Sequence, residues 1–208
     1  MSFDIPDSKI TALNPLDLYR QLNKDPKFKG LIHPQEPIIE KYYVLKDNKD
    51  LSIQLATAGG KTLIGLLIGE WRRTHLQERV LYLTSTRQLA NQVANEAESL
   101  GISVVVLHGK FLDYPEADCE AYTNCKSIAI SNYTSFFNTS TRFKEGSDAY
   151  SIGNPQCLIC DDAHSADNYV SSQYSIEISR VKYKLLYEES LQRIENSEYL
   201  NQHATTFP

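Results

Sequence analysis

The sequence lacks every segment that would place it in a membrane or direct it out of the cell. No apolar run approaches the roughly 20 residues that a membrane-spanning helix needs. The first residues, MSFDIPDSKI, contain neither the basic region nor the apolar core of a secretion signal. These absences predict a cytoplasmic protein with no membrane partner.

Positive charge is also scarce. The 21 lysines and arginines are outnumbered by 26 aspartates and glutamates, which gives a net charge of −5. A strongly basic chain would indicate nucleic-acid binding by its net charge alone. The net charge of this chain gives no such indication. Any contact with nucleic acid must therefore come from a local site.

The chain has only four cysteines, and two of them, Cys157 and Cys160, have the C-x-x-C spacing of zinc and redox sites. They lie in QCLICD, a run of strand character, and residues three apart on a strand point to opposite faces. One metal ion could not easily bind both. The pattern therefore predicts reduced cysteines buried in the core, and a four-cysteine zinc site that includes Cys119 and Cys125 is the alternative.

Strand-like and helix-like segments alternate along most of the 208 residues. Residues 1–30 are mixed and rich in Pro, Asn and Asp, which indicates an N-terminal extension with a short helix near 15–22. The pattern predicts one α/β domain at residues 31–200 and a frayed tail at residues 201–208. Apolar runs predict strands at 51–56, 79–85, 102–109, 126–132 and 156–162. Helical spacing predicts helices at 61–75, 86–100 and 182–200, and polar composition predicts a surface loop at 138–155.

The predicted strands are almost continuously apolar, as strands buried on both faces are. Strands that alternate with helices favour a mostly parallel sheet with helices on both faces. In such folds ligands bind at the carboxyl ends of the strands. Each polar cluster considered below directly follows a predicted strand or its loop.

The stretch LATAGGKT, residues 55–62, follows one predicted strand and opens a predicted helix. A phosphate-binding loop needs small residues so that backbone N–H groups can wrap the phosphates. Gly59 and Gly60 supply this backbone. Lys61 supplies the charge and Thr62 a hydroxyl for Mg²⁺, at a helix N-terminus that favours phosphate. The first position is Leu rather than Gly or Ala, and the alternative is a chance GGKT at a turn.

The stretch CDDAH, residues 160–164, ends another apolar strand. Two successive carboxylates are costly there unless a positive charge is close, and nucleotide-bound Mg²⁺ would supply it. The alternative is an Asp-rich turn that caps a helix. Combined with a phosphate loop, the pair indicates a metal site.

The stretch LTSTRQLANQ lies at a turn from strand to helix. Its hydroxyls, backbone N–H groups and guanidinium could hold the phosphates of a nucleic-acid strand, which would position the strand without reading its sequence. The alternative is that a hydroxyl only caps the helix. The candidate contacts are Thr84, Ser85, Thr86 and Arg87.

In this order and spacing, LATAGGKT, LTSTRQLANQ and CDDAH resemble motifs I, Ia and II of the superfamily 2 helicases, the DEAD/DEAH-box type. The resemblance covers roughly residues 30–180. It implies a RecA-like P-loop domain of α/β class that binds ATP with Mg²⁺ and a strand of DNA or RNA through its backbone.

The resemblance assigns nucleotide contacts by position. Lys61 would reach the β- and γ-phosphates, and Thr62 and Asp161 would hold Mg²⁺. Gln35, in HPQEPI, would bind the adenine edge, although a lone Gln is also common on a solvated helix. The whole nucleotide loop would comprise Thr57, Ala58, Gly59, Gly60, Lys61 and Thr62.

With Lys61, two residues of CDDAH would be catalytic. His164 matches the His that senses the γ-phosphate, and Asp162 occupies the position of the Glu that activates the attacking water. Asp is one methylene shorter, so its carboxylate lies about 1.5 Å further back. A misplacement of about 1 Å can cost on the order of a hundredfold in rate. The resemblance therefore supports nucleotide binding more than hydrolysis.

SNYTSFF, residues 131–137, resembles a further strand-contacting motif of the same family. Asn132, Tyr133 and Thr134 are its candidate contacts. Tyr133 and Phe136 fit a protein core equally well, and for Phe136 the core is the preferred interpretation.

The second half of such an enzyme has no counterpart in the sequence. After CDDAH fewer than 50 residues follow, with neither an S-A-T-like segment nor a Q-x-x-G-R-x-x-R-like one. Family members close ATP between two RecA-like domains, and an arginine from the second raises the rate about 10³- to 10⁵-fold in related hydrolases. The expected partner is therefore a C-terminal RecA-like domain that is absent from this chain.

These patterns predict the ATP-binding N-terminal motor domain of a helicase or translocase, which hydrolyses ATP only when a second domain joins it. One alternative is a non-catalytic nucleotide-binding module in which Asp162 has relaxed catalysis. Another is a double-stranded DNA translocase of a restriction or defence system. A metabolic P-loop kinase would not explain TSTRQLANQ before DDAH.

Overall fold

The computed structural model describes residues 12–28, 30–32, 34–56, 59–146 and 150–197 of the chain. It divides into two units, Met1–Gln173 and Tyr174–Pro208, each described by itself. The second unit contains α8 (Lys184–Glu195), in which no residue is buried. Among the described residues, no helix has the length and apolar character that crossing a membrane requires.

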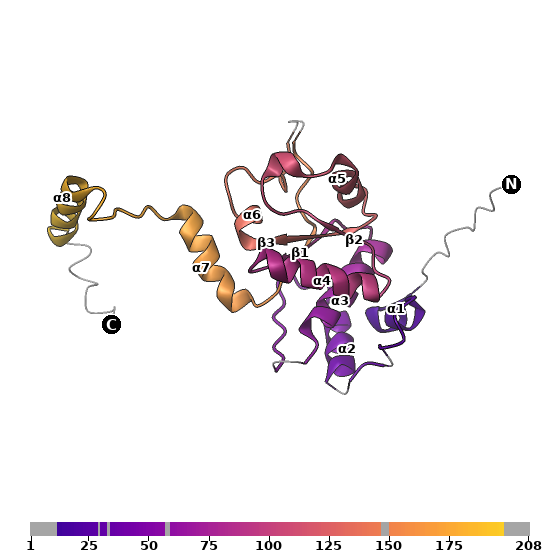
Figure 1. Ribbon diagram of the computed structural model, residues 1–208. Coiled ribbons are helices and arrows are strands. Elements are labelled where there is room, and N and C mark those ends of the chain that lie inside the picture. The colour runs from indigo at the N-terminus through magenta and orange to yellow at the C-terminus, as the bar shows by residue number, and fades with distance from the viewer. Residues whose placement is uncertain (1–11, 29, 33, 57–58, 147–149, 198–208) are drawn as a thin grey trace. The chain divides into compact units, whose positions relative to one another are not determined.

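The first unit alternates helices and strands, and α7 ends one residue beyond it (Figure 1). In chain order its elements are α1 (Pro15–Gln21), α2 (Gln35–Leu45), α3 (Lys61–His75), β1 (Val80–Thr84), α4 (Arg87–Ser99), β2 (Val104–Val106), the short 3-10 helix η1 (Phe111–Asp113), α5 (Glu116–Thr123), β3 (Ile128–Asn132), α6 (Tyr133–Phe136), β4 (Cys157–Cys160) and α7 (Ala163–Tyr174).

The four strands form one parallel sheet in the order β2-β3-β1-β4. Both faces of β1 are covered, because successive residues point to opposite sides. Val80 and Tyr82 belong to a core shared with α1–α4, and Leu81 and Leu83 belong to a second core with α5 and the segment after β3. The predicted α/β class, with a parallel sheet and helices on both faces, is confirmed.

Helix α3 packs closely on the sheet because two of its residues have no side chain. An added Cβ at Gly65 would lie 2.8 Å from the Tyr82 ring. An added Cβ at Gly69 would lie 3.1 Å from side-chain atoms of Val80 and Ile159. The residues from 63 to 71 are all buried, so the helix that follows the nucleotide loop is anchored along its length.

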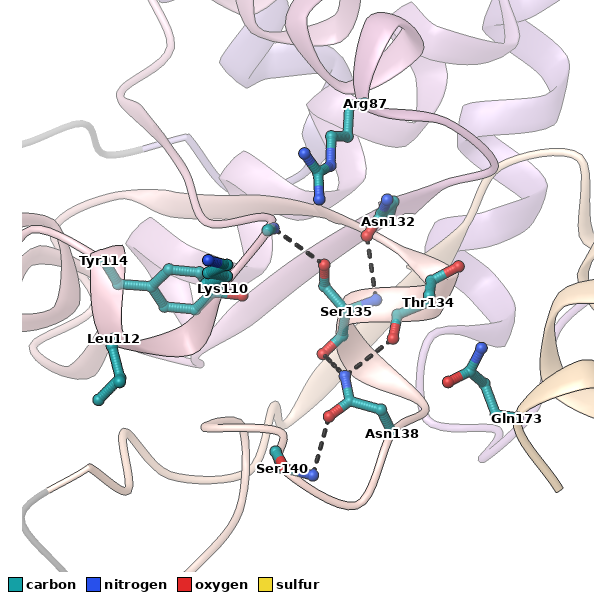
Figure 2. A pocket seen from close by; sticks show the side chains of 11 residues that line it. Arg87, Lys110, Leu112, Tyr114, Asn132, Thr134, Ser135, Asn138, Ser140 and Gln173 are labelled. Carbon is teal, nitrogen blue, oxygen red and sulfur yellow. Dashed lines mark hydrogen bonds between the residues drawn. The ribbon is translucent and has the colours of Figure 1, made fainter.

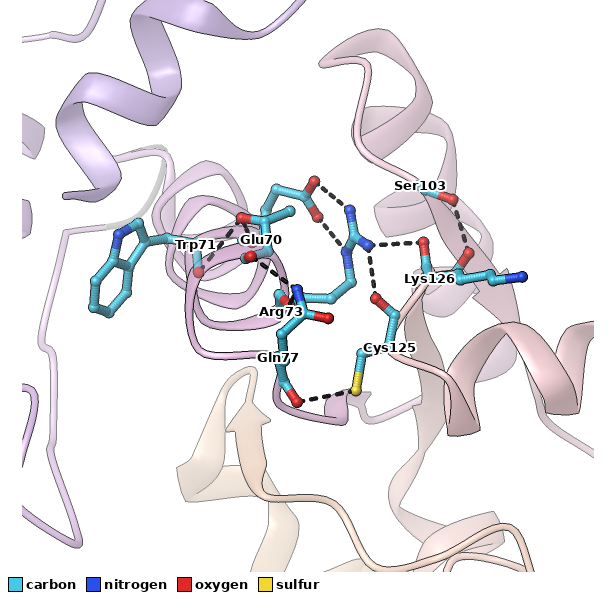
Figure 3. Close-up of polar contacts among 9 residues, drawn as sticks. Glu70, Trp71, Arg73, Gln77, Ser103, Cys125 and Lys126 are labelled. Carbon is cyan, nitrogen blue, oxygen red and sulfur yellow. Dashed lines mark hydrogen bonds and ion pairs between the residues drawn. The ribbon is translucent and has the colours of Figure 1, made fainter. Parts of the chain in front are cut away.

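A buried ion pair fixes the C-terminal part of α3 (Figure 3). Arg73 binds both carboxylate oxygens of Glu70 at 2.6 and 2.8 Å. The same guanidinium donates to the backbone carbonyls of Cys125 at 2.8 Å and Lys126 at 2.9 Å, which precede β3. The side chain of Glu70 is only 3% exposed. Separating this pair would leave a buried charge without a partner, which is costly. The contact therefore holds α3 against the turn between α5 and β3.

The strand predicted at 51–56 does not form. These residues have no regular secondary structure, and the side chains of Leu51 and Ile53 are 38% and 40% exposed. Apolar spacing can suggest a strand, but a strand also needs a neighbour for its backbone hydrogen bonds. Among the described residues, β4 is an edge strand that pairs only with β1. Two other predicted strands are shorter than expected, at Val104–Val106 and Cys157–Cys160.

The prediction of four buried cysteines is wrong for Cys160, which is exposed, whereas Cys119 is buried and Cys125 and Cys157 are half-buried. The reason is that β4 alternates, with its Leu158 and Cys160 face uncovered. All four thiols are free. Within the described ranges, no group of three or more His, Cys, Asp or Glu residues is arranged to hold a metal ion.

The polar segment 138–155 has no helix or strand among its described residues, as predicted for a loop. It is nevertheless anchored, because Phe143 and Ile152 are buried in the second core. Phe136 also packs against this core, in agreement with its preferred interpretation.

Candidate functional site

The parallel strands bring the predicted site residues to one edge of the sheet. Thr84, at the end of β1, pairs with Asn132 at the end of β3, and Leu83 pairs with Cys160 at the end of β4. The segments that follow these strands contain the hydroxyl, amide and carboxylate groups noted in the sequence. The site is therefore built from strand ends, where ligands bind in folds of this class.

The loop before α3 presents a helix N-terminus without a side-chain cap. Its last residue, Gly60, has a left-handed backbone with φ +75° and forms no side-chain cap hydrogen bond to α3. The first-turn N–H groups of a helix attract anions when side chains do not occupy them. The loop residues Thr57 and Ala58 lie outside the described residues.

Gln35 is folded against this loop rather than solvated. It is 4% exposed. Its side-chain oxygen accepts from the Ile32 N–H at 2.9 Å, and its amide donates to the Gly59 carbonyl at 3.2 Å. An added Cβ at Gly60 would lie only 2.0 Å from the Gln35 amide nitrogen. Gln35 thus supports the loop directly, and adenine binding by it stays a prediction.

Lys61 and Asp162, which are 101 residues apart in the sequence, form an ion pair across the site. Lys61 Nζ lies 3.1 Å from Asp162 Oδ1, and the two side chains are 40% and 47% exposed. Exposed pairs of this kind are weak, so an anionic ligand can compete for the lysine. Asp162 has a left-handed backbone, with φ +47°. The structure therefore brings together two of the three predicted catalytic groups, one from motif I and one from motif II.

The two predicted Mg²⁺ ligands, Thr62 and Asp161, adjoin the two members of this ion pair. Thr62 directly follows Lys61, and Asp161 directly precedes Asp162. Burial raises the pKa of Asp161, the adjacent Asp162 carboxylate raises it further, and Lys61 opposes both effects. A half-buried carboxylate beside a second carboxylate is stabilised by a cation. This oxygen donor set fits Mg²⁺.

Tyr133, the first residue of α6 and the residue directly after β3, contacts Asp161. Its hydroxyl donates to the Asp161 backbone carbonyl at 2.6 Å. The Asp161 N–H in turn donates to the Leu83 carbonyl at 2.9 Å. Tyr133 is fully buried, so in this structure its side chain belongs to the core and offers no surface to a nucleic acid.

The residues of LTSTRQLANQ divide into buried and exposed groups. Thr84 is 1% exposed and its hydroxyl donates to the Thr86 and Ser131 carbonyls. Thr86 caps α4, accepting from the Leu89 N–H at 3.2 Å, so the capping interpretation is confirmed for this residue. Ser85 is half-buried, whereas Arg87 is exposed.

A hollow of about 340 Å³ lies beside Arg87 (Figure 2). Its wall includes two cations and no carboxylate. The residues around it are Arg87, Gly109, Lys110, Leu112, Tyr114, Asn132, Thr134, Ser135, Asn138, Ser140 and Gln173. Two hydrogen bonds shape the wall, from the Gly109 N–H to Ser135 Oγ at 3.2 Å and from the Ser135 N–H to Asn132 Oδ1 at 3.0 Å.

Three residues predicted to contact nucleic acid, Arg87, Asn132 and Thr134, line this hollow, whereas Lys110 and Asn138 were not predicted. Lys110 follows β2 at the same edge of the sheet, so its place after a strand was the available signal. Asn138 donates to the backbone carbonyls of Thr134 and Ser135. No pattern indicates that contact, because it depends on the turn at the end of α6.

His164 lies in the first turn of α7 and is exposed. Its predicted coupling to the γ-phosphate and to a second domain stays a prediction.

Comparison with known proteins adds one finding. The family model described as DEAD/DEAH box helicase matches residues 33–195, which is most of the chain. The match includes every segment that contributes to the site described above. The search of curated proteins found no match, and the search of solved structures found none either.

Proposed function

This chain belongs to the DEAD/DEAH box helicase family, and we propose that it is the ATP-binding N-terminal motor domain of a nucleic-acid helicase or translocase. The observation that carries the proposal is the ion pair of Lys61 with Asp162 at one edge of the sheet, next to Thr62 and Asp161 in the sequence. Residues from motifs I and II of a nucleotide hydrolase meet there, although about 100 residues separate them.

In this proposal Lys61 binds the β- and γ-phosphates, and the uncapped N-terminus of α3 adds backbone N–H groups. Asp161 and Thr62 hold Mg²⁺. The bound metal would neutralise charge that develops on the phosphates during transfer. Lys61 would exchange the exposed Asp162 carboxylate for a phosphate oxygen, which frees Asp162 to orient a water molecule.

The nucleic-acid strand would bind at the hollow beside Arg87. The chain is acidic overall, with a net charge of −5, yet Arg87 and Lys110 face this hollow without a carboxylate in its wall. Such a local positive site with hydroxyl and amide groups suits a phosphate backbone. Backbone contacts do not distinguish bases, so the proposal covers DNA or RNA.

Hydrolysis would require a second RecA-like domain that closes over the nucleotide. The exposure of Lys61 and Asp162 supports this part of the proposal, because water-excluded sites strengthen electrostatic catalysis. The test is steady-state ATP turnover by the pure chain with a single-stranded oligonucleotide. We expect well below about one turnover per second. Several turnovers per second, lost in Lys61→Ala, would contradict the half-site proposal.

A second candidate function is a nucleotide-binding module without hydrolysis. It is favoured by Asp162, which is shorter than the Glu of related motifs and is already paired with Lys61. The discriminating variant is Asp162→Glu, tested with a second RecA-like domain supplied. A large gain in turnover would support lost catalysis, whereas a loss would support a site adapted to Asp.

A further inference from the structure

We propose that Ser135 is a positioning residue for the strand site, acting through the Gly109 N–H on the loop that carries Lys110. This inference rests on the proposed function, because it takes the hollow beside Arg87 as the place where a nucleic-acid strand binds. The predicted strand contacts of this segment end at Thr134, one residue earlier.

The loop after β2 brings one cation to the hollow and passes beside another. Gly109 in this loop has a left-handed backbone, with φ +95°. A Cβ added at Gly109 would lie 3.6 Å from Arg87 Nη2 and 3.8 Å from Arg87 Cζ, so the guanidinium lies next to the bare Cα. Lys110 directly follows and also lines the hollow (Figure 2). The backbone at Gly109 therefore sets the place of Lys110 beside Arg87.

Ser135, in α6, holds this loop. Its hydroxyl accepts from the Gly109 N–H at 3.2 Å (Figure 2). The chain is also attached two residues earlier, where the Leu107 N–H donates to the Ile130 carbonyl at 2.9 Å and the Leu107 carbonyl accepts from the Ser131 hydroxyl. The Ser135 contact extends this attachment to the residue directly before the loop lysine.

Ser135 is itself fixed in place. Its N–H donates to Asn132 Oδ1 at 3.0 Å, and its carbonyl accepts from Asn138 Nδ2 at 2.7 Å. Ser135 is only 8% exposed, whereas the neighbouring Thr134 is exposed. A residue that is held at its N–H, hydroxyl and carbonyl, and that has little free surface, is suited to orienting its neighbour rather than to contacting a ligand.

This attachment matters for binding because the two cations repel each other. Arg87 and Lys110 face the same hollow, and no carboxylate is among the described residues of its wall. Like charges in one place favour a loop that moves apart unless a contact holds it. A loop that is held before the strand arrives loses less conformational freedom on binding. The Ser135 hydroxyl therefore raises the affinity for a phosphate backbone without contacting it.

The test separates this role from simple packing. Ser135→Ala removes only the hydroxyl. Ser127→Ala is the matched control, because Ser127 is 5% exposed and its hydroxyl is hydrogen-bonded to Ser103 Oγ at 2.7 Å. Ser127 directly precedes β3 and so lies at the other end of this strand from the hollow. Both variants delete one hydrogen-bonded serine hydroxyl, so we expect similar midpoints in urea unfolding.

The experiment is a fluorescence-anisotropy titration of the full chain with single-stranded oligonucleotides, one of DNA and one of RNA, at a series of salt concentrations. For Ser135→Ala we expect an affinity lower by about 2- to 10-fold and a weaker dependence of affinity on salt concentration. For Ser127→Ala we expect wild-type binding. In a Lys110→Ala background, Ser135→Ala should have no further effect, because the lysine that the hydroxyl positions is then absent.

Each other outcome overturns the inference in a recognisable way. Wild-type affinity in Ser135→Ala would show that the hydroxyl does not position the loop. An equal loss with and without the Lys110 side chain would show that Ser135 acts on the strand by another route. A urea midpoint far below that of Ser127→Ala would show a general folding defect. If the wild-type chain binds neither oligonucleotide, the strand site of the proposed function is wrong, and the inference that rests on it fails too.

Discussion

The sheet is closed on one side of β1 and open on the other. On the closed side, every residue of β1 and β3 is buried. On the open side, β4 alternates between half-buried and exposed residues, and it is the edge strand among the described residues. We call β1, β3 and the buried α3 residues packed on them the closed half, and β4 with residues 59–62 and 161–162 the open half.

The comparison indicates that stability and chemistry are placed in different parts of one sheet. The closed half contains the buried ion pair of α3, and Tyr133, directly after β3, donates to the Asp161 carbonyl. The open half contains Lys61 and Asp162, which are exposed and weakly paired. Charged groups are costly to bury without partners, so the ligand-binding groups lie at the surface, where a ligand of opposite charge can pair with them. The buried core of the closed half does not depend on these groups for its packing.

The largest change in the free energy of unfolding should come from removing the buried ion pair of the closed half. Arg73→Ala leaves the Glu70 carboxylate, only 3% exposed, without its cation. Removing one partner of a buried pair typically costs about 3–5 kcal/mol. Urea unfolding followed by the fluorescence of Trp71, the single tryptophan, measures the change.

The matched control is Arg20→Ala, which removes an ion pair of the same i,i+3 spacing whose arginine side chain is 64% exposed. Exposed pairs contribute about 0–1 kcal/mol, so its unfolding midpoint should hardly move. Equal shifts in the two variants would contradict the assignment of stability to the closed half.

The next effect should come from Gly60, the residue directly before α3, whose backbone is left-handed. Gly60→Ala forces a side chain into a backbone of φ +75°, 2.0 Å from the Gln35 amide nitrogen. The left-handed conformation alone costs about 1–2 kcal/mol, and the loop must move. We expect ADP affinity to fall by about tenfold or more, measured by calorimetry. Gly30→Ala is the control, since an added Cβ there meets nothing within 4 Å.

A smaller effect is expected at the strand site. Arg87→Ala removes one of the two cations that face the hollow. If the Arg87 side chain contacts a phosphate, the variant should bind single-stranded oligonucleotides of every sequence more weakly by a similar factor. The slope of the logarithm of the binding constant against the logarithm of salt concentration should also become shallower by about one. Fluorescence anisotropy with two oligonucleotides of different sequence measures both. A loss confined to one sequence would indicate base recognition instead.

The smallest expected effect is a change in stability with pH at Glu96, a half-buried residue that packs beside the closed half on α4. Burial raises the pKa of Glu96 in α4. The folded chain therefore binds this proton more readily than the unfolded chain, and stability is lost as pH rises through the raised pKa. Glu96→Gln should be slightly more stable than wild type at pH 7, and the difference should disappear below about pH 4. Thermal unfolding at both pH values tests this, with the exposed Glu98→Gln as control.

Local patterns predicted the elements whose formation depends on nearby residues. Helix α3 spans the residues expected from its apolar spacing, and α4 begins at the Thr86 cap. The order of motifs also placed Lys61 and Asp162 in one site. These features depend on short-range periodicity and on the rule that parallel strands end at one edge.

The remaining features depend on segments that are distant in the sequence. Whether 51–56 forms a strand depends on a pairing neighbour, which its own residues cannot supply. The burial of Tyr133 depends on the packing of the second core, and the folding of Gln35 against the loop depends on how α2 lies next to the start of α3. A residue-type pattern contains no such distances.

The central claim is that the open half binds a nucleotide through Lys61. Its most direct test is a calorimetric titration of Mg-ATP and Mg-ADP into the chain, beside Lys61→Ala. We predict saturable binding to the wild type and none to the variant, with the variant folded as judged by an unchanged urea midpoint. Equal binding by both proteins, or none by the wild type, would contradict the claim.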